Sequence, residues 1–293
     1  MVETNETSPS VCRFLDDGYI DLLHAKFCEA FADYVVPFQV SASQFQNHII
    51  LNAVDLSSSV GYFVNDEMVG FTLNGLGDWN GIPTVYDAGT GVVPAYRRRG
   101  ISERMFEMML PVFKARGIGQ CLLEVVTTND PAIRLYEKLG FSKTRTLLLL
   151  EADAAPRPSR EMPDDIVIRE IDDIEGVLSQ GFWDGTPSWQ NSTEAILRSR
   201  KIKRVLGAFI DGNCVGYAVF SARFGRIAQL AVAREFRERG VATALLAGME
   251  AETDPGACPQ VINIDSQLTG AVDFFRKAGF KQKLAQFEMI KPL

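Results

Sequence analysis

A short basic segment with a central glycine has the residue types needed to bind an anion. It reads Arg97-Arg98-Arg99-Gly100-Ile101-Ser102 and follows an apolar stretch that ends at Val93. A helix is expected from Ile101, and the N–H groups at a helix start are unpaired and lie at the positive end of the helix dipole. Gly100 has no side chain, so a phosphate could approach its backbone closely. The simpler interpretation of this segment alone is a basic turn at the protein surface.

The chain repeats this segment and a second one in the same order. Arg97–Ser102 recurs as Arg237–Ala242, 140 positions later, and Leu135–Phe141 recurs as Phe274–Phe280, 139 positions later. Two unrelated motifs that keep their order and nearly the same offset indicate an internal repeat. Between the copies, residues 152–164 contain three prolines among charged residues, which is typical of a linker. We therefore predict an N-terminal domain over residues 1–152, a linker over 153–164 and a C-terminal domain over 165–293.

Both copies of the basic segment resemble the Gln/Arg-x-x-Gly-x-Gly/Ala loop of the GNAT superfamily of acyltransferases. In the first copy, Ser102 takes the place of the final Gly or Ala. In that family the loop binds the pyrophosphate of coenzyme A, and the preceding strand pairs with its pantetheine arm. The resemblance implies acetyl-CoA as a cosubstrate of the first domain, bound by residues of the strand end and the loop: Val92, Val93, Arg97, Arg98, Arg99, Gly100, Ile101 and Ser102. In the second domain, Leu230 and Val232 would lie along the arm.

The segment Asn129–Phe141 resembles the Asn-x-x-Ala-x-x-Leu-Tyr-x-x-x-Gly-Phe signature of the same family. There the asparagine contacts the pantetheine and the tyrosine hydroxyl lies near the thioester sulfur, which implies these roles for Asn129 and Tyr136. A tyrosine O–H can protonate the thiolate that leaves when an amine attacks the acetyl carbon. Without the resemblance, Tyr136 would be interpreted as part of the packing face of an amphipathic helix.

The second domain departs from the signature at both polar positions. Phe275 stands where the tyrosine is expected, and Leu268 stands where the asparagine is expected. A phenyl ring can pack but cannot donate a proton. Because the Arg237–Ala242 loop is kept, this domain could still bind coenzyme A. We predict that it is a degenerate copy that serves as scaffold or as a binder without turnover.

Two carboxylates are candidates for the general base. Asp87 and Glu124 lie on strands expected to flank the site, and either could deprotonate an ammonium group directly or through water. Asp87 is the preferred candidate, and the alternative is that both are ordinary strand residues. An acyl-enzyme on Cys121 is disfavoured because no histidine lies nearby in the sequence. By the resemblance, an aromatic and acidic group would shape the acceptor pocket: Phe31, Asp33, Tyr34 and Trp79.

The expected elements alternate in the same order in both halves. Ser41 and Gln44 have the spacing of a capping box, which predicts a helix start. Pro131 suits the first turn of a helix that ends at Gly140. The predicted fold is α/β (α+β), with two tandem GNAT-like domains, each a mixed, mostly antiparallel sheet flanked by helices. The resemblance implies that the central strands splay to admit the pantetheine arm, with strands in the first half near 59–64, 68–73, 84–93 and 121–126.

Composition excludes several function classes. The formal net charge of −7 and the pI near 5.1 argue against binding of nucleic acid or an anionic membrane. The five cysteines are scattered and the chain has two histidines, so a disulfide framework or a metal site is not expected. No apolar run approaches a membrane span, and Met1–Ser10 lacks the apolar core of a signal peptide. The sequence predicts a cytoplasmic protein.

These features together predict an N-acetyltransferase. The primary amine of a small molecule or peptide would attack acetyl-CoA directly, with Tyr136 assisting thiolate departure. Backbone N–H groups at the end of the 84–93 strand would polarise the acetyl carbonyl. Two alternatives stay open, a non-catalytic protein that binds or senses acyl-CoA and a protein-lysine acetyltransferase. The sequence does not indicate the acceptor, the acyl chain length or the oligomeric state.

Overall fold

The computed structural model describes residues 9–33, 40–152, 164–178 and 181–293, so nearly all of the predicted linker lies outside the described residues. The chain forms two compact units. Unit 1 comprises Met1–Val125, Asn129–Lys143 and Met289–Leu293, and unit 2 comprises Val126–Thr128 and Thr144–Glu288. Each unit is an α/β body built around a sheet, as predicted, and the two are described separately below.

Unit 1 begins with strand β1 (Ser10–Phe14), which leads through a 3-10 turn into helices α1 (Ile20–Ala30) and α2 (Ala42–Leu51). The predicted capping box is present at α2. The Ser41 hydroxyl accepts from the Gln44 N–H at 3.3 Å, and the Gln44 side chain accepts from the Ser41 N–H at 2.8 Å. Two of the unpaired donors at the helix start are satisfied in this way, which fixes where α2 begins.

The sheet of unit 1 has the order β1-β2-β3-β4-β5. Neighbouring strands are antiparallel except β4 and β5, which are parallel because helix α3 connects them. The remaining elements of this unit are β2 (Val60–Val64), β3 (Glu67–Trp79), β4 (Ile82–Val92), α3 (Ile101–Ala115), β5 (Gln120–Val126) and α4 (Asp130–Lys138).

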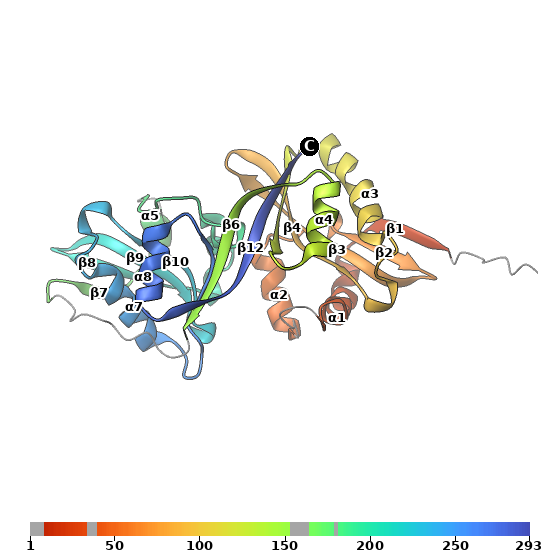
Figure 1. The fold of residues 1–293 in the computed structure, drawn as a ribbon. Coiled ribbons are helices and arrows are strands. Elements are labelled where there is room, and N and C mark those ends of the chain that lie inside the picture. The colour runs from red at the N-terminus through yellow and green to blue at the C-terminus, as the bar shows by residue number, and fades with distance from the viewer. Residues whose placement is uncertain (1–8, 34–39, 153–163, 179–180) are drawn as a thin grey trace, which may run out of the picture. The chain divides into compact units, whose positions relative to one another are not determined.

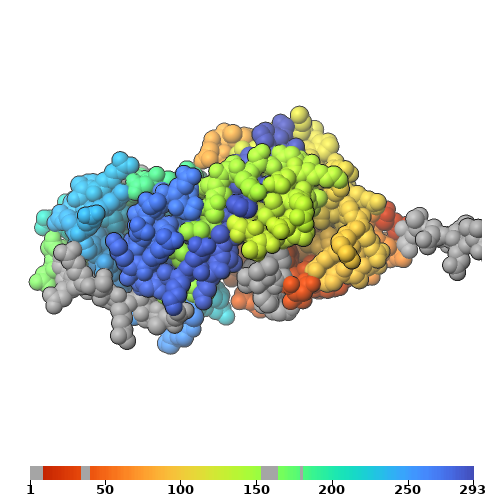
Figure 2. All heavy atoms as spheres, in the orientation of Figure 1, coloured from red at the N-terminus to blue at the C-terminus, as the bar shows by residue number. Residues whose placement is uncertain are grey.

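The helices of unit 1 cover opposite faces of this sheet (Figure 1). Phe71 of β3 packs against Phe27 of α1, with ring centroids 6.0 Å apart. The next residue, Thr72, points the other way and contacts Met109 of α3. Helix α4 lies beside α3, as the adjoining yellow and green surfaces in Figure 2 show. The first face therefore carries α1 and α2, and the second carries α3 and α4.

Unit 2 repeats this order of elements. Its sheet runs β12-β6-β11-β10-β9-β8-β7, and the parallel pair is β10 with β11. Its elements are β6 (Ser142–Ala152), β7 (Val167–Glu170), α5 (Ile174–Leu178), α6 (Thr193–Arg198), β8 (Arg204–Ile210), β9 (Asn213–Ser221), β10 (Arg226–Val232), α7 (Val241–Glu252), β11 (Gln260–Asp265), α8 (Thr269–Lys277) and β12 (Phe280–Pro292). No helix among the described residues is long and apolar enough to cross a membrane.

The last strand of each sequence half contributes to the unit formed mainly by the other half. Most of β6, from Thr144 onward, belongs to unit 2, where it pairs antiparallel with β11. The end of β12 belongs to unit 1, where the Leu293 N–H donates to the Gly119 carbonyl at 3.0 Å. The domain boundary at residue 152 stays a prediction. A division of the chain at that residue would put all of β6 in unit 1 and all of β12 in unit 2, whereas most of β6 packs in unit 2 and the end of β12 packs in unit 1.

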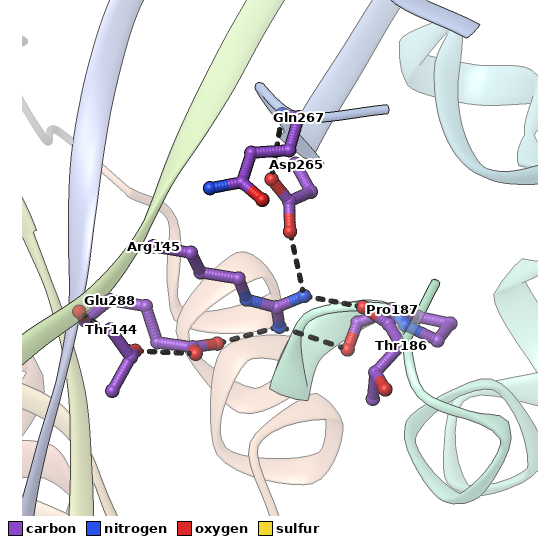
Figure 3. Close-up of polar contacts among 7 residues, drawn as sticks. All are labelled: Thr144, Arg145, Thr186, Pro187, Asp265, Gln267 and Glu288. Carbon is purple, nitrogen blue, oxygen red and sulfur yellow. Dashed lines mark hydrogen bonds and ion pairs between the residues drawn. The ribbon is translucent and has the colours of Figure 1, made fainter. Parts of the chain in front are cut away.

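A buried ion pair fixes β6 inside unit 2 (Figure 3). The Arg145 guanidinium donates to Glu288 of β12 at 2.7 Å and to the carbonyls of Thr186 and Pro187 at 2.5 and 3.3 Å. Asp265 of β11 lies 3.5 Å away. The Glu288 side chain is 4% exposed and that of Arg145 is 13% exposed. Loss of the Glu288 charge would therefore leave Arg145 poorly compensated in a region with little water.

We predict that Glu288→Gln lowers the free energy of unfolding by about 3 kcal/mol, because it leaves the Arg145 charge without its nearest carboxylate. The matched control is Asp273→Asn, which makes the same chemical change in the exposed Arg276–Asp273 pair of α8. That change should cost less than about 0.5 kcal/mol. Denaturant unfolding of both variants measures the difference, and equal effects would contradict a structural role for the buried pair.

Candidate active site

Strands β4 and β5 pair only over their first residues. The parallel ladder runs from Thr84 opposite Gln120 to Asp87 opposite Leu123 and ends there. On the other edge of β4, Asp87 pairs with Asn74 and Gly89 pairs with Leu73, so Ala88 is an extra residue in a β-bulge. The bulge and the end of the ladder coincide, and beyond them the strands part as the sequence analysis anticipated.

Asp87 and Tyr136, which are 49 residues apart in the sequence, meet at this point. The Tyr136 hydroxyl donates to the Asp87 carboxylate at 3.4 Å. The same carboxylate accepts from the Thr90 hydroxyl at 2.8 Å and from the Gly89 N–H at 3.0 Å. Burial raises the pKa of Asp87 to about 6, and these hydrogen bonds oppose that rise. A carboxylate with this pKa can accept a proton near neutral pH.

The position of Tyr136 follows from the two ends of α4. Asn129 is the N-cap, and its side-chain oxygen accepts from the Ala132 N–H at 3.3 Å. Gly140 ends the helix at φ +91°, a conformation that glycine adopts without strain. The Tyr136 ring packs edge-on against Phe106 and Phe141, with centroids 5.9 and 5.7 Å away. Asn129 therefore helps to fix the helix that presents the tyrosine.

Glu124, the second candidate base, lies on the opposite face. It follows the last ladder residue of β5, and its carboxylate accepts from the Tyr86 hydroxyl at 3.2 Å. Tyr86 and Asp87 are consecutive in β4, so their side chains point to opposite faces of the sheet. Glu124 is thus placed on the side away from Tyr136, and Asp87 is the carboxylate that contacts the predicted acid.

The thiol of Cys121 is buried, and burial raises its pKa to about 12. A thiol with that pKa is protonated at neutral pH and is a poor nucleophile, in agreement with the preference for direct transfer. Across the part of the chain that the structure describes, no three His, Cys, Asp or Glu side chains are grouped as metal ligands.

Arg97 forms hydrogen bonds to other residues of unit 1. Its guanidinium donates to the Val92 carbonyl at 3.2 Å, to the Ala30 carbonyl at 2.9 Å and to both carboxylate oxygens of Asp33 at 2.7 Å. Hydrogen bonding to Arg97 holds the pKa of Asp33 below its ordinary value. Arg97 thereby joins the loop to the end of α1, and a phosphate would have to compete with Asp33 for it.

Unit 2 contains the same arginine clamp. Arg237 donates to the Val232 carbonyl at 3.0 Å, to the Phe182 carbonyl at 3.1 Å and to the Asp184 carboxylate at 2.6 Å. Because both copies keep all three kinds of partner, the first arginine of the motif is a structural element of each loop. The sequence alone predicts only an anion-binding role for Arg97.

The loop backbone has the geometry expected of an anion site. Arg98 and Gly100 both have positive φ, at 61° and 73°, and Glu238 and Gly240 repeat this in unit 2 at 58° and 89°. Such a conformation turns successive N–H groups toward one side. A Cβ atom built on Gly100 would meet nothing within 4 Å, and no side chain caps α3. The start of α3 therefore has room beside Gly100 for an anion to approach its N–H groups.

The other predicted contacts differ in how exposed they are. Val92 is partly exposed, whereas Val93 is buried and its N–H donates to the Val69 carbonyl at 3.0 Å. The Arg99 guanidinium stacks over Tyr96 and donates to the Ala95 carbonyl at 3.0 Å. Among the residues predicted to shape the acceptor site, Phe31 packs against Phe27 and Phe71, Trp79 is buried, Asp33 binds Arg97 and Tyr34 lies outside the described residues.

Unit 2 has an apolar residue at each polar position of the site. Phe275 and Leu268 correspond to Tyr136 and Asn129, and Ile227 stands 140 positions after Asp87. The β10–β11 ladder also ends early, at Ile227 opposite Val261, and Ala228 is the bulge residue. The Ile227 substitution was missed in the sequence analysis, although the constant offset between the two loops would have revealed it.

A buried chain of hydrogen bonds joins the parted strands of unit 2. The Tyr217 hydroxyl accepts from the Trp183 indole and donates to Gln229 of β10 at 2.9 Å. Gln229 donates to the Asn191 carbonyl, and Asn191 donates to the Ile262 carbonyl of β11, both at 2.6 Å. Side chains of the protein therefore bridge β10 and β11 where the two strands separate.

Comparison with known proteins assigns both halves to one family. Residues 24–141 match the acetyltransferase (GNAT) family, and residues 180–289 match the acetyltransferase (GNAT) domain. Over 62 residues, 21% of the chain, the sequence is 45% identical to the N-alpha-acetyltransferase RimI of Mycobacterium tuberculosis. Over 88 residues, 30% of the chain, it is 30% identical to streptothricin acetyltransferase of Streptomyces lavendulae. These matches span 37% and 46% of the two enzymes, less than half of either.

A solved structure shares the fold over nearly the whole chain. It is a tandem GNAT protein from the clavulanic acid biosynthesis pathway, with 16% sequence identity and a TM-score of 0.73. The alignment covers 97% of this chain and 98% of that protein. At this level of identity the likeness concerns the fold alone, namely two domains of this type in one chain.

The raised pKa of Asp87 has a consequence for stability. Between its ordinary pKa of 3.8 and about 6, folded Asp87 binds more protons than unfolded Asp87. The free energy of unfolding should therefore fall as the pH rises through this window. This decrease in the free energy of unfolding is on the order of 2 kcal/mol between pH 4 and 7. We predict that it is absent in Asp87→Asn. Denaturant unfolding across that range measures it, and parallel curves for the two proteins would contradict the assignment.

Proposed function

Because the chain belongs to the GNAT acetyltransferase family, we propose that unit 1 transfers an acetyl group from acetyl-CoA to the primary amine of a small molecule or peptide. The observation that carries this proposal is the contact between Asp87 and Tyr136 at the point where β4 and β5 part. A candidate base and a candidate acid thus share one hydrogen bond at the end of the β4–β5 ladder.

The cosubstrate would be bound by two features of unit 1. The phosphates would accept from the N–H groups at the start of α3, where Gly100 leaves open space. The arm would lie along β4 beyond Asp87, where the β5 ladder has ended and Val92 is partly exposed. The Gly89 N–H is occupied by Asp87, so polarisation of the acetyl carbonyl falls to other N–H groups of this stretch.

The contact between Asp87 and Tyr136 suits a proton relay. Asp87 takes one proton from the ammonium group, directly or through water, and the neutral amine attacks the acetyl carbon. As the C–N bond forms and the C–S bond breaks, Tyr136 gives its hydroxyl proton to the departing sulfur. Asp87 then returns its proton to Tyr136 across the 3.4 Å contact. The second proton lost by the nitrogen leaves to solvent, so the products are the amide and the free thiol.

Unit 2 would have a structural role and would not catalyse the transfer. Ile227, Leu268 and Phe275 can neither accept a proton from an amine nor protonate a thiolate. The hydrogen-bonded residues Gln229 and Asn191 occupy the region where its strands part. Its basic loop keeps the same backbone conformation, so weak binding of coenzyme A by unit 2 is compatible with this proposal.

The proposed class of acceptor is based on relatives that match short stretches of this chain. They include N-alpha-acetyltransferases, a ribosomal protein alanine N-acetyltransferase and a streptothricin acetyltransferase. Both peptide and small-molecule amines are therefore candidates. A screen of amines with acetyl-CoA that follows release of the free thiol tests the proposal. Turnover with free small amines supports a metabolite enzyme, and no turnover with any amine or peptide would contradict transferase activity.

We predict that Tyr136→Phe lowers turnover roughly 10²–10⁴-fold while the affinity for acetyl-CoA stays nearly constant. The ring and its packing on Phe106 remain, and only the hydroxyl is lost. Tyr62→Phe is the matched control, because Tyr62 is a buried tyrosine of the same unit whose hydroxyl contacts Ser10 and Arg104. Wild-type turnover in Tyr136→Phe would show that the hydroxyl is dispensable.

We also predict that Gly100→Glu abolishes transfer and the thermal shift caused by acetyl-CoA, whereas Gly240→Glu preserves transfer. Each change places a carboxylate at a residue with positive φ, at 73° and 89°, so the backbone strain is matched. At a hundredfold excess over the dissociation constant, the wild-type shift should correspond to about 2.7 kcal/mol. Circular dichroism confirms folding first. Activity that survives Gly100→Glu and disappears with Gly240→Glu would assign the chemistry to unit 2.

A further inference from the structure

One peptide group of the bulge is held at both ends by side chains. The carbonyl of Ala88 accepts from Nε2 of His48, on helix α2, at 2.9 Å. The N–H of the same peptide, which belongs to Gly89, donates to the Asp87 carboxylate at 3.0 Å. In a trans peptide the C=O and N–H point in opposite directions. His48 and Asp87 therefore lie at the two ends of one polarised amide.

The partners of His48 define its tautomer. A carbonyl can only accept, so Nε2 must carry the hydrogen that is shared with Ala88. Nδ1 is then the acceptor in the neutral ring, and it lies 3.1 Å from the side-chain nitrogen of Asn52, which can donate. Asn52 is itself held, because it donates to the His48 carbonyl at 2.9 Å. The chain of donors runs from Asn52 through His48 and the Ala88–Gly89 peptide to Asp87.

The sequence places His48 where it can reach the bulge from α2. The helix start is fixed by the Ser41 capping box, and Phe45 and Ile49 on the same helix are buried. The His48 ring packs 5.7 Å from the Phe27 ring of α1. These contacts hold α2 against the sheet face opposite Tyr136. The imidazole is thus aimed at the one residue of β4 that leaves the β3 register.

This arrangement occurs only where the polar site occurs. Both histidines of the chain, His24 and His48, lie in the first half of the sequence. Unit 2 has the equivalent bulge at Ala228 but has Ile227 in place of the aspartate. A bulge by itself therefore needs no histidine in this chain, and the histidine occurs at the bulge that also carries the aspartate.

We propose that His48 is a positioning residue for Asp87, which it orients and polarises through the Ala88–Gly89 peptide. The proposal rests on the acetyl transfer proposed above, in which Asp87 is the base. Donation to the Ala88 carbonyl makes the Gly89 N–H a better donor, because hydrogen bonds in series strengthen one another. A stronger N–H bond stabilises the ionised carboxylate and fixes its direction relative to Tyr136.

Other titratable groups among the described residues approach Asp87 or its strand from several elements. Tyr136 approaches from α4, Cys121 from β5, and Tyr86 and Glu124 face the opposite side of the sheet. Lys291 acts on Cys121 from the end of β12. Loss of the His48 donor removes support for the charged carboxylate, so the pKa of Asp87 should rise above its value of about 6. The acid limb of the rate profile should then move to higher pH.

Three substitutions separate positioning from packing. His48→Phe keeps an aromatic ring without a donor, and His48→Leu is a second variant without a donor if the first does not fold. His48→Gln keeps an N–H near the position of Nε2. The matched control is His24→Phe, which removes an Nε2 contact of the same kind, to the Val40 carbonyl at 2.7 Å, without touching Asp87.

The readouts are kcat, KM for acetyl-CoA, the pH profile and the carboxyl titration of Asp87 by carbon NMR in the free enzyme. We expect His48→Phe to lower kcat roughly tenfold with little change in KM, as for loss of one hydrogen bond. Both the rate limb and the titration of Asp87 should move to higher pH. His48→Gln should restore most of kcat and the titration, and His24→Phe should match the wild type.

An Asp87 titration that is the same in His48→Phe and the wild type would overturn the proposal, and so would equal losses in His48→Phe and His24→Phe. The NMR titration needs no acceptor, so it tests the link between His48 and Asp87 even if no amine is acetylated. Absence of transfer by the wild type would instead count against the proposed function alone.

Discussion

The interruption of strand β4 at Ala88 is the constraint on which the site depends. Every backbone N–H and C=O that leaves the sheet needs another partner if it is withdrawn from water. Three side chains supply such partners along the strand: His48 for the Ala88 carbonyl, Asp87 for the Gly89 N–H and Arg97 for the Val92 carbonyl. Asp87, the candidate base, is thus also one of the residues that stabilise an incomplete strand.

Unit 2 meets the same constraint with different residues. It keeps the bulge, the early end of the parallel ladder and the arginine clamp at Arg237. It replaces the aspartate by Ile227 and joins its separated strands through Gln229 and Asn191. The clamp is therefore a requirement of the fold, whereas Asp87, Tyr136 and His48 are features of unit 1 alone. This contrast separates residues that the fold needs from residues that a reaction would need.

Local sequence signals predicted much of the fold. The Ser41 capping box, the Gly140 helix end and the two-domain α/β organisation are confirmed, because they depend on short-range chemistry and on an internal repeat. The membership of β6 in unit 2 was not predicted, since strand pairing between sequence halves leaves no local signal.

The site was predicted less completely. The sequence identified Asp87 and Tyr136 separately, but only tertiary structure brings residues 49 positions apart into contact. The bond from His48 to the Ala88 carbonyl depends on a bulge, which alternation of side chains does not reveal. The bond from Arg97 to the Val92 carbonyl depends on how the loop folds back on β4. The catalytic roles of Asp87 and Tyr136 stay predictions, and so do the roles of Asn129 and the loop residues in binding the cosubstrate.

The central claim is that Asp87 and Tyr136 act as one unit. A double-mutant cycle of single-turnover acetyl transfer tests it, with Asp87→Asn, Tyr136→Phe and the double variant measured at one pH above 7. If one proton passes between the two groups, either single change breaks the relay, and the double variant should be scarcely slower than the slower single variant. Losses that multiply, so that the double variant shows the product of the two single effects, would show that the residues act independently and would contradict the relay.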